Sequence, residues 1–422
     1  MKYFIFSLGC KVNSYECSAT ATTLENNGYF FDKENPDVVI INTCSVTHVA
    51  DQKSRQHIRK FRLLYPNAIL VIMGCFAQSH YEYILKELDY DILLGTCNRK
   101  HILEYINRFK ENGSKIFAVD NNPRKFLCYE ELGATACSEN VRAYLKVQDG
   151  CDNFCSYCLV PYIRGKSRSR DFDQVLNEAK DLIVKGYKEI VISGINAGCY
   201  GKDIGSNIYE LVKALADIPG LYRLRISSIE LSEISDELIQ LMAKNPRIAK
   251  HFHIPLQSGS NKILKQMGRK YTREQFISRV NEIKQIIPDV ALTSDVIVGF
   301  PDESDDDYMD TVNLLKELQF YQIHAFPYSP REKTKAVDMT NQINPAIKKM
   351  RVNGLIVLDK LLRANFEKRF YGQEMDVLVE KHIPGYDIGH TSNYLMVRVP
   401  SLNSGVGQVK KTKIDSNNIE EF

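Results

Sequence analysis

Short apolar runs separated by amphipathic stretches fill the first part of the chain. Three of these runs are continuous and rich in β-branched side chains: residues 2–7, 38–42 and 69–73. The stretches 13–27 and 49–65 between them have the mixed apolar and polar pattern of helices. Continuous apolar strands divided by helices are typical of a parallel sheet covered on both faces. We therefore predict an open α/β domain with a parallel sheet over residues 1–120.

The same alternation resumes after a polar segment, residues 121–140, which we predict to be a linker. Six further strand-like runs follow it: residues 142–147, 189–193, 224–227, 251–254, 291–298 and 321–326. Helical stretches such as 173–185 and 274–287 separate them. Six βα repeats predict a (βα)6 partial TIM barrel over residues 141–370. In such a barrel the chemistry lies at the C-terminal ends of the strands.

The pattern changes again after residue 370. Residues 375–380 and 394–399 alternate between apolar and polar positions. Glycines interrupt this region: Gly385, Gly389, Gly405 and Gly407. Short alternating runs with glycine between them predict a small all-β domain over residues 371–422. The predicted fold class of the whole chain is therefore α/β, with a small all-β domain at the end.

Charge and hydropathy narrow the class of protein. The 422 residues include 55 basic and 52 acidic side chains, a net charge of +3. Such a balance argues against a protein that coats nucleic acid by bulk charge, although a local basic patch is still possible. No apolar run reaches the length of a signal sequence or a membrane span. We therefore expect a cytoplasmic protein with no membrane partner, in which the 11 cysteines are thiols or metal ligands rather than disulfides.

Three cysteines lie within eight residues directly after the first predicted barrel strand. Cys151, Cys155 and Cys158 have the spacing CxxxCxxC. A structural zinc site needs four ligands, usually as two CxxC pairs, and no second pair lies nearby. A 4Fe–4S cluster held by three cysteines keeps one iron open for a ligand. We therefore favour such a cluster over a zinc site.

A second set of cysteines lies at equivalent positions of the N-terminal domain. Cys10, Cys44 and Cys75 each follow one of the three predicted strands. Ligands of an open parallel sheet bind at the carboxyl ends of its strands, so these thiols should lie at one edge. We predict a second cluster with three protein ligands there. The remaining cysteines lack ligand spacing and are expected to be plain thiols: Cys17, Cys97, Cys128, Cys137 and Cys199.

The two triads together resemble those of the methylthiotransferase family of radical S-adenosylmethionine (SAM) enzymes. Further motifs agree with this resemblance, at residues 147–150, 161–170, 193–196, 225–230, 253–260, 295–301 and 326–331. The resemblance covers nearly the whole chain. It implies an N-terminal methylthiotransferase domain, a radical-SAM barrel and a C-terminal TRAM RNA-binding domain. It also implies two 4Fe–4S clusters and SAM as cofactors.

The resemblance assigns roles to the clusters and to residues near them. The cluster of the barrel would bind SAM and generate a 5′-deoxyadenosyl radical, with Tyr157 packed against the adenine. The N-terminal cluster would hold the sulfur, which a second SAM methylates. Further groups at the strand ends are predicted SAM or substrate contacts: Gly194, Asn196, Ser228, Glu230, Gln257 and Ser258.

Basic side chains form three groups that could contact RNA phosphates. The first lies on the helix between the second and third strands: Lys53, Arg55, Arg59, Lys60 and Arg62. The second lies beside the cluster loop: Arg164, Lys166, Arg168 and Arg170. The third lies in the all-β domain: Lys381, Lys410, Lys411 and Lys413. We expect tRNA and not DNA as the nucleic-acid partner, and an electron donor such as flavodoxin or ferredoxin.

The family has three substrate branches. The segments 9–13 (Gly-Cys-Lys-Val-Asn) and 389–394 resemble the branch that acts on threonylcarbamoyladenosine beside the tRNA anticodon. In that branch the methylthio group is transferred to carbon 2 of the adenine. Isopentenyl-adenosine in tRNA and an aspartate of a ribosomal protein are the alternative substrates. An alternative of another class is a non-catalytic iron–sulfur RNA-binding regulator, which would not cleave SAM.

Overall fold

The computed structural model describes residues 1–133 and 141–420. The predicted linker, residues 121–140, therefore falls partly outside the described residues, and Cys137 lies outside them entirely. No helix in the described ranges is long and apolar enough to cross a membrane.

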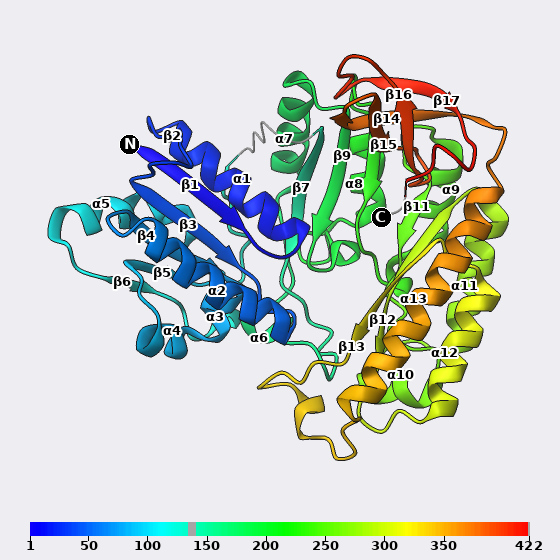
Figure 1. The fold of residues 1–422 in the computed structure, drawn as a ribbon, viewed down its shortest axis with the longest axis horizontal. Helices are drawn as coiled ribbons and strands as arrows, with labels where there is room; N and C mark the ends of the chain where they lie inside the picture. Colours follow the sequence, from blue (N-terminus) through cyan, green and yellow to red (C-terminus); the bar gives the residue numbers. More distant parts are fainter. Residues whose placement is uncertain (134–140, 421–422) are drawn as a thin grey trace.

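A parallel sheet forms the N-terminal part, with its strands in the order β2-β1-β3-β4-β5-β6 (Figure 1). The strands are β1 (Lys2–Ser7), β2 (Phe30–Phe31), β3 (Val38–Thr43), β4 (Ile69–Gly74), β5 (Ile92–Leu94) and β6 (Ile116–Ala118). The helices are α1 (Lys11–Glu25), α2 (His48–Leu64), α3 (Cys75–Ser79), α4 (Tyr81–Glu87) and α5 (Ile102–Asn112). Alternate residues of the central strands pack against α1 and α5 on one face and α2, α3 and α4 on the other. Burial on both faces explains why these strands are continuous apolar runs, and the predicted open α/β fold is confirmed.

Parallel strands β7, β9, β10, β11, β12 and β13 follow one another around a partial barrel. Their bounds are β7 (Arg142–Asp149), β9 (Glu189–Gly194), β10 (Arg223–Ile226), β11 (His251–His253), β12 (Ala291–Val298) and β13 (Gln322–Pro327). A short strand β8 (Arg168–Ser169) pairs antiparallel with β7. Helices alternate with the strands: α6 (Val160–Ile163), α7 (Phe172–Val184), α8 (Ile208–Ala216), α9 (Asp236–Lys244), α10 (Asn261–Met267), α11 (Arg273–Ile286) and α12 (Asp305–Leu318). One apolar core joins strands and helices, and the predicted partial barrel is confirmed.

Helix α13 (Pro345–Lys368) leads to an antiparallel sheet with the order β16-β15-β14-β17. The strands are β14 (Glu374–Ile383), β15 (Tyr386–His390), β16 (Met396–Pro400) and β17 (Val409–Lys413). The sequence pattern misses β15 because Gly389 reads as an interruption. In the structure Gly389 lies within the strand, where a Cβ atom would come 1.9 Å from the carbonyl oxygen of Leu378. Strand β17 was not predicted, because it is rich in lysine and does not show an alternation of apolar and polar residues.

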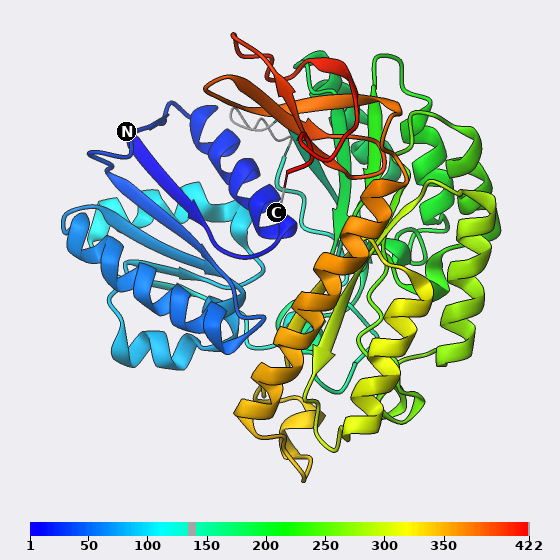
Figure 2. The ribbon, with the colours of Figure 1, turned by 45° about the vertical axis from the view of Figure 1, so that its right-hand side comes forward.

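Both smaller domains contact the barrel (Figure 2). Helix α1 of the N-terminal domain packs against β7 and β9. The C-terminal domain packs on the barrel at the N-terminal ends of the strands, where Tyr394 stacks on His251 with ring centroids 4.3 Å apart. Arg225 of β10 donates hydrogen bonds to the carbonyl oxygens of Thr391 and Ser392, each at 3.2 Å. These contacts hold the three parts of the chain in one arrangement.

Candidate active site

The three N-terminal cysteines lie at the carboxyl ends of adjacent parallel strands. Cys10 follows β1 and precedes the first turn of α1, Cys44 follows β3, and Cys75 begins α3 directly after β4. Burial raises the pKa of Cys44 to about 12, and the neighbouring thiols of Cys75 and Cys10 add to the effect. The sheet therefore brings together three cysteines that are about thirty residues apart in sequence, as predicted.

A glycine makes this close approach possible. The backbone of Gly9 has φ +105°, and a Cβ atom there would lie 2.8 Å from the sulfur of Cys44. We expect Gly9→Ala to displace Cys44 and to lower the iron content of the N-terminal site, measured by iron analysis of anaerobically purified protein. Gly28→Ala is the matched control, because Gly28 has φ +80° and no atom of the described residues lies within 4 Å of its Cβ position. Equal iron loss in both variants would assign the effect to backbone strain instead.

The second triad lies on the loop after β7. The backbone N–H of Cys151 donates to the carbonyl of Gly165 at 3.1 Å, and that of Ser156 donates to the carbonyl of Met267 at 2.9 Å. Burial raises the pKa of Cys158 to about 12, and the neighbouring Cys155 adds to it. The loop is thus held by backbone hydrogen bonds at Cys151 and at Ser156.

One cavity lies between the two triads. It has a volume of about 260 Å³, and its wall includes Cys10, Cys44 and Cys75 on one side and Cys158 on the other. Other lining residues come from both domains: Asn13, Ser45, Val46, Thr47, Tyr157, Leu159, Ile163, Arg164, Ile195, Gln257, Asp295, Ile297, Phe326, Tyr328 and Ser329. A group bound in this cavity would face both sets of cysteines.

The thiols are spread more widely than a single zinc ion requires. Sulfur ligands lie about 2.3 Å from zinc, which places them roughly 4 Å from one another. Within the described residues, neither triad has its three sulfurs within 4.8 Å of one another. Three thiols around a larger centre fit an iron–sulfur cluster with one open iron.

Several predicted SAM contacts lie at or near this cavity. Tyr157 and Gln257 are part of its wall. Gln257 has φ +67°, a conformation that is unusual outside glycine, and its buried Oε1 has no hydrogen-bond partner among the described residues. In the same described part of the chain, the buried Oδ1 of Asn196 has no partner either, although its amide nitrogen donates to the sulfur of Cys199 at 3.1 Å. Unpaired buried polar atoms are costly, so a polar cofactor that pairs with them fits this site.

The other predicted SAM contacts, Gly194, Glu230, Ser228 and Ser258, are not among the lining residues of the cavity. A Cβ atom at Gly194 would lie 3.1 Å from the side chain of Gln148. Glu230 pairs with Arg269, whose guanidinium also lies 3.6 Å from the sulfur of Cys155. Ser228 is half-buried and forms a backbone bridge with β11. Ser258 is fully buried, and its hydroxyl accepts a hydrogen bond from the backbone N–H of Ser260 at 3.2 Å.

The predicted RNA contacts beside the cluster loop need correction. Arg164, Arg168 and Arg170 are all buried, with 1% to 3% of the residue exposed. Each pairs with acidic side chains inside the protein, Arg170 with Glu178 for example. A buried and paired guanidinium cannot reach an RNA phosphate, so only Lys166 of this group is exposed. In the all-β domain Lys381, Lys411 and Lys413 are exposed, whereas the half-buried Lys410 pairs with Asp387 at 2.6 Å.

Arg164 belongs to a buried ion-pair network that joins the two domains beside both triads. It donates to Glu16 of α1 at 2.8 Å and to Asp149 of β7 at 3.1 Å. Lys146 bonds the same two carboxylates at 2.9 and 2.6 Å, and Arg99 lies 2.5 Å from Glu16. The network is fully buried, and it ties the helix that follows Cys10 to the strand that precedes Cys151. The sequence does not reveal this network, because Glu16 lies 130 positions from Lys146 and 148 positions from Arg164.

A second contact between the domains lies beside Cys44. Arg331, which follows β13, donates to Asp51 of α2 at 2.6 Å and to the hydroxyl of Ser45 at 2.7 Å. All three residues are buried. The barrel therefore fixes the loop of the N-terminal triad directly.

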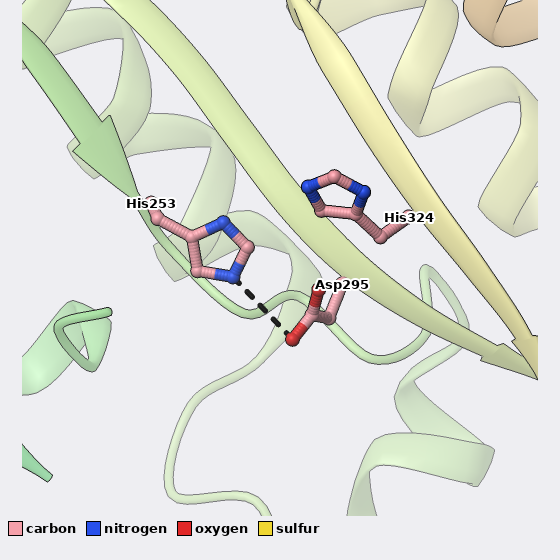
Figure 3. Close-up of side chains that lie close together, drawn as sticks. All are labelled: His253, Asp295 and His324. Atoms are coloured by element: carbon pink, nitrogen blue, oxygen red, sulfur yellow. Dashed lines mark ion pairs between the residues drawn. The ribbon is translucent and has the colours of Figure 1, made fainter. Parts of the chain in front are cut away.

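His253, Asp295 and His324 gather on the neighbouring strands β11, β12 and β13 (Figure 3). Nε2 of His253 lies 3.4 Å from a carboxylate oxygen of Asp295, and its Nδ1 lies 2.9 Å from the hydroxyl of Thr293. Asp295 is part of the cavity wall. Burial lowers the pKa of His324, so this imidazole tends to be neutral. His253 and Asp295 begin two of the sequence motifs, whereas His324 lies in none of them.

Comparison with known proteins identifies the family. Residues 145–315 match the Radical SAM superfamily, and residues 2–95 match Uncharacterized protein family UPF0004. The chain is 40% identical over 419 residues to threonylcarbamoyladenosine tRNA methylthiotransferase MtaB of Bacillus subtilis, covering 97% of this chain and 92% of that protein. The chain belongs to the radical-SAM methylthiotransferase family. The enzyme is therefore a radical-SAM methylthiotransferase, with SAM and 4Fe–4S clusters as cofactors.

Two further comparisons define the scope of this likeness. The tRNA-2-methylthio-N(6)-dimethylallyladenosine synthase of Clostridium novyi is 35% identical over 430 residues, covering 99% of this chain and 94% of that protein. The radical SAM methyltransferase TsrM of Kitasatospora setae has a similar structure, with a TM-score of 0.57 and 14% identity, covering 78% of this chain and 76% of that one. At that identity TsrM supports the fold alone.

Proposed function

We propose that this enzyme converts threonylcarbamoyladenosine next to the tRNA anticodon to its 2-methylthio derivative. The observation that carries the proposal is a cavity whose wall includes Cys10, Cys44, Cys75 and Cys158. With cofactors bound, the barrel site would supply a radical to remove hydrogen from carbon 2 of the adenine, and the N-terminal site would supply the methylthio sulfur. The Bacillus subtilis relative is named for this substrate.

The protein itself would position the two cysteine triads relative to each other and to the bound base. The buried network around Glu16 and the contact of Arg331 with Ser45 set the distance between the two triads. Apolar wall residues such as Ile195, Ile297 and Phe326 would exclude water from a bound base. Tyr157 and Gln257 would contact SAM, with the six cysteines as cluster ligands.

For the approach of tRNA we propose the exposed lysines Lys166, Lys381, Lys411 and Lys413 as phosphate contacts. They lie on the barrel and on the C-terminal domain, so the tRNA would span both. Reduction of the barrel cluster needs an external electron donor, for which we propose a flavodoxin or ferredoxin.

The test is mass spectrometry of tRNA nucleosides from cells that lack this protein, with and without its restored expression. We expect the 2-methylthio derivative of threonylcarbamoyladenosine to disappear and return while its precursor changes in the opposite direction. Loss of methylthio-isopentenyl-adenosine instead would select the substrate for which the Clostridium novyi relative is named. Unchanged tRNA with loss of a ribosomal-protein modification would select the third branch. A regulator without catalysis would form no 5′-deoxyadenosine from SAM.

A further inference from the structure

Two histidines and one aspartate form a cluster on three neighbouring strands of the barrel. The cluster consists of His253 of β11, Asp295 of β12 and His324 of β13, whose side chains point toward one another (Figure 3). Each side chain offers one ligand atom, and the three atoms all lie within 4.8 Å of one another. Imidazole nitrogen together with carboxylate oxygen is a ligand set that proteins use for zinc and for ferrous iron.

The register of the strands places this cluster on the cavity side of the barrel. Asp295 pairs with His324, and two residues further along the strands Ile297 pairs with Phe326. Side chains two residues apart on a strand project from the same face of the sheet. Asp295, Ile297 and Phe326 all line the cavity between the cysteine triads. His324 therefore lies on the same face as they do, and an ion held by the cluster would lie next to the cavity.

The distance between His253 and Asp295 suits an ion between them better than a direct hydrogen bond. Nε2 of His253 lies 3.4 Å from a carboxylate oxygen of Asp295. A charge-assisted hydrogen bond between such atoms is about 2.7–2.9 Å long. Two ligands of one tetrahedral zinc ion, each about 2.0–2.1 Å from the metal, are roughly 3.4 Å apart. Within the described residues, neither the carboxylate of Asp295 nor the ring of His324 has a hydrogen-bond partner.

A buried threonine fixes the orientation of the His253 ring. The hydroxyl of Thr293 lies 2.9 Å from Nδ1 of His253. Histidines that bind a metal generally donate their other ring N–H to a neighbouring acceptor in this way. When Nδ1 donates to the hydroxyl, Nε2 presents its lone pair to the space that His253 shares with Asp295 and His324. The surroundings of His253 thus resemble those of a metal ligand.

We propose that His253, Asp295 and His324 bind one divalent transition-metal ion, separate from the iron–sulfur clusters. Zinc fits best, because it binds nitrogen and oxygen sites more tightly than ferrous iron does. Three protein ligands leave one tetrahedral position of the ion open, as in catalytic zinc sites. Since Asp295 lines the cavity, the open position would take an oxygen ligand from that side, either water or a carboxylate or carbonyl group of a bound substrate. Binding of the ion does not depend on which nucleoside the enzyme modifies.

The test uses the full-length enzyme with both clusters assembled, equilibrated anaerobically with zinc and then dialysed to remove the free ion. We expect about one zinc ion per chain to be retained, with the iron content unchanged. X-ray absorption at the zinc edge should show only nitrogen and oxygen neighbours, about 2.0–2.1 Å from the metal. Sulfur neighbours at about 2.3 Å would place the zinc on cysteines and overturn the proposal, as would the absence of retained zinc. This spectrum of the wild type decides the question even if a variant fails to assemble its clusters.

Three variants test the ligands. His324→Ala should lose the retained zinc and keep its iron, and Thr293→Val, which removes the hydroxyl beside His253, should weaken zinc binding about 10- to 100-fold. His101→Ala is the matched control and should retain zinc as the wild type does. His101 is exposed and lies 3.3 Å from Glu104, a similar pair that no third ligand joins in the described part of the chain. Zinc retention by His324→Ala equal to that of the wild type would overturn the proposal, and so would loss of the zinc in His101→Ala.

Discussion

Cys158→Ala is expected to abolish the cleavage of SAM to 5′-deoxyadenosine, whereas Cys44→Ala should preserve that cleavage and stop methylthio transfer. The two cysteines border the same cavity but belong to different triads, one on the barrel loop and one after β3. Loss of one of three ligands exposes a cluster to dissociation, because its metal affinity depends on the full ligand set. The radical step needs only the barrel site, and the sulfur step needs both.

The measurement is quantification of 5′-deoxyadenosine and of methylthiolated RNA in one anaerobic assay, with iron content determined for each variant. Cys128→Ala is the control, since this cysteine is exposed and is not part of the cavity wall. Each active-site variant should lose about half of the iron, while the control loses none. If Cys44→Ala also lost SAM cleavage and all of its iron, the two sites would have to assemble as one unit.

The barrel and the two triads could be predicted because their signals are local. The strand-like run of residues 291–298 predicts a barrel strand, and the bounds of β12 match it. Cys10, Cys44 and Cys75 could be grouped because the ends of parallel strands share one edge. Both inferences need only the periodicity of the chain and one rule of topology.

The arginines show what local signals miss. A basic run beside a cluster loop reads as an RNA contact, but Arg164 is buried and pairs with Glu16, which lies 148 positions earlier. Whether a charge faces solvent or a partner depends on the packing of α1 against β7, and no periodicity in either segment encodes that contact. The carboxylate of Glu16 is likewise unremarkable in sequence. His324 lies in an ordinary strand pattern and gains its neighbours from β11 and β12.

Glu16→Gln is expected to lower the free energy of unfolding by about 3–5 kcal/mol, because it leaves buried cations without their counter-charge. Glu16 is fully buried, and Arg164, Lys146 and Arg99 surround it. Methylthio transfer should also fall more than SAM cleavage, since the network fixes one triad relative to the other. Thermal unfolding of the cluster-containing enzyme is the measurement. Glu111→Gln is the control, as that glutamate is exposed at the end of α5. Equal stability of the two variants would contradict a structural role for the network.

The pH dependence of this difference follows from the sign of the pKa shift. Burial by itself raises the pKa of Glu16, but Arg164, Arg99 and Lys146 outweigh it and hold the pKa well below its ordinary value of about 4.5. A lowered pKa in the folded state contributes stability that is complete above the unfolded value and is lost as the pH falls towards the folded value. The gap between wild type and Glu16→Gln should therefore stay constant from about pH 8 to pH 5 and shrink below about pH 4.5. A gap that changed near neutral pH would instead implicate a histidine, and none of the network residues named here is one.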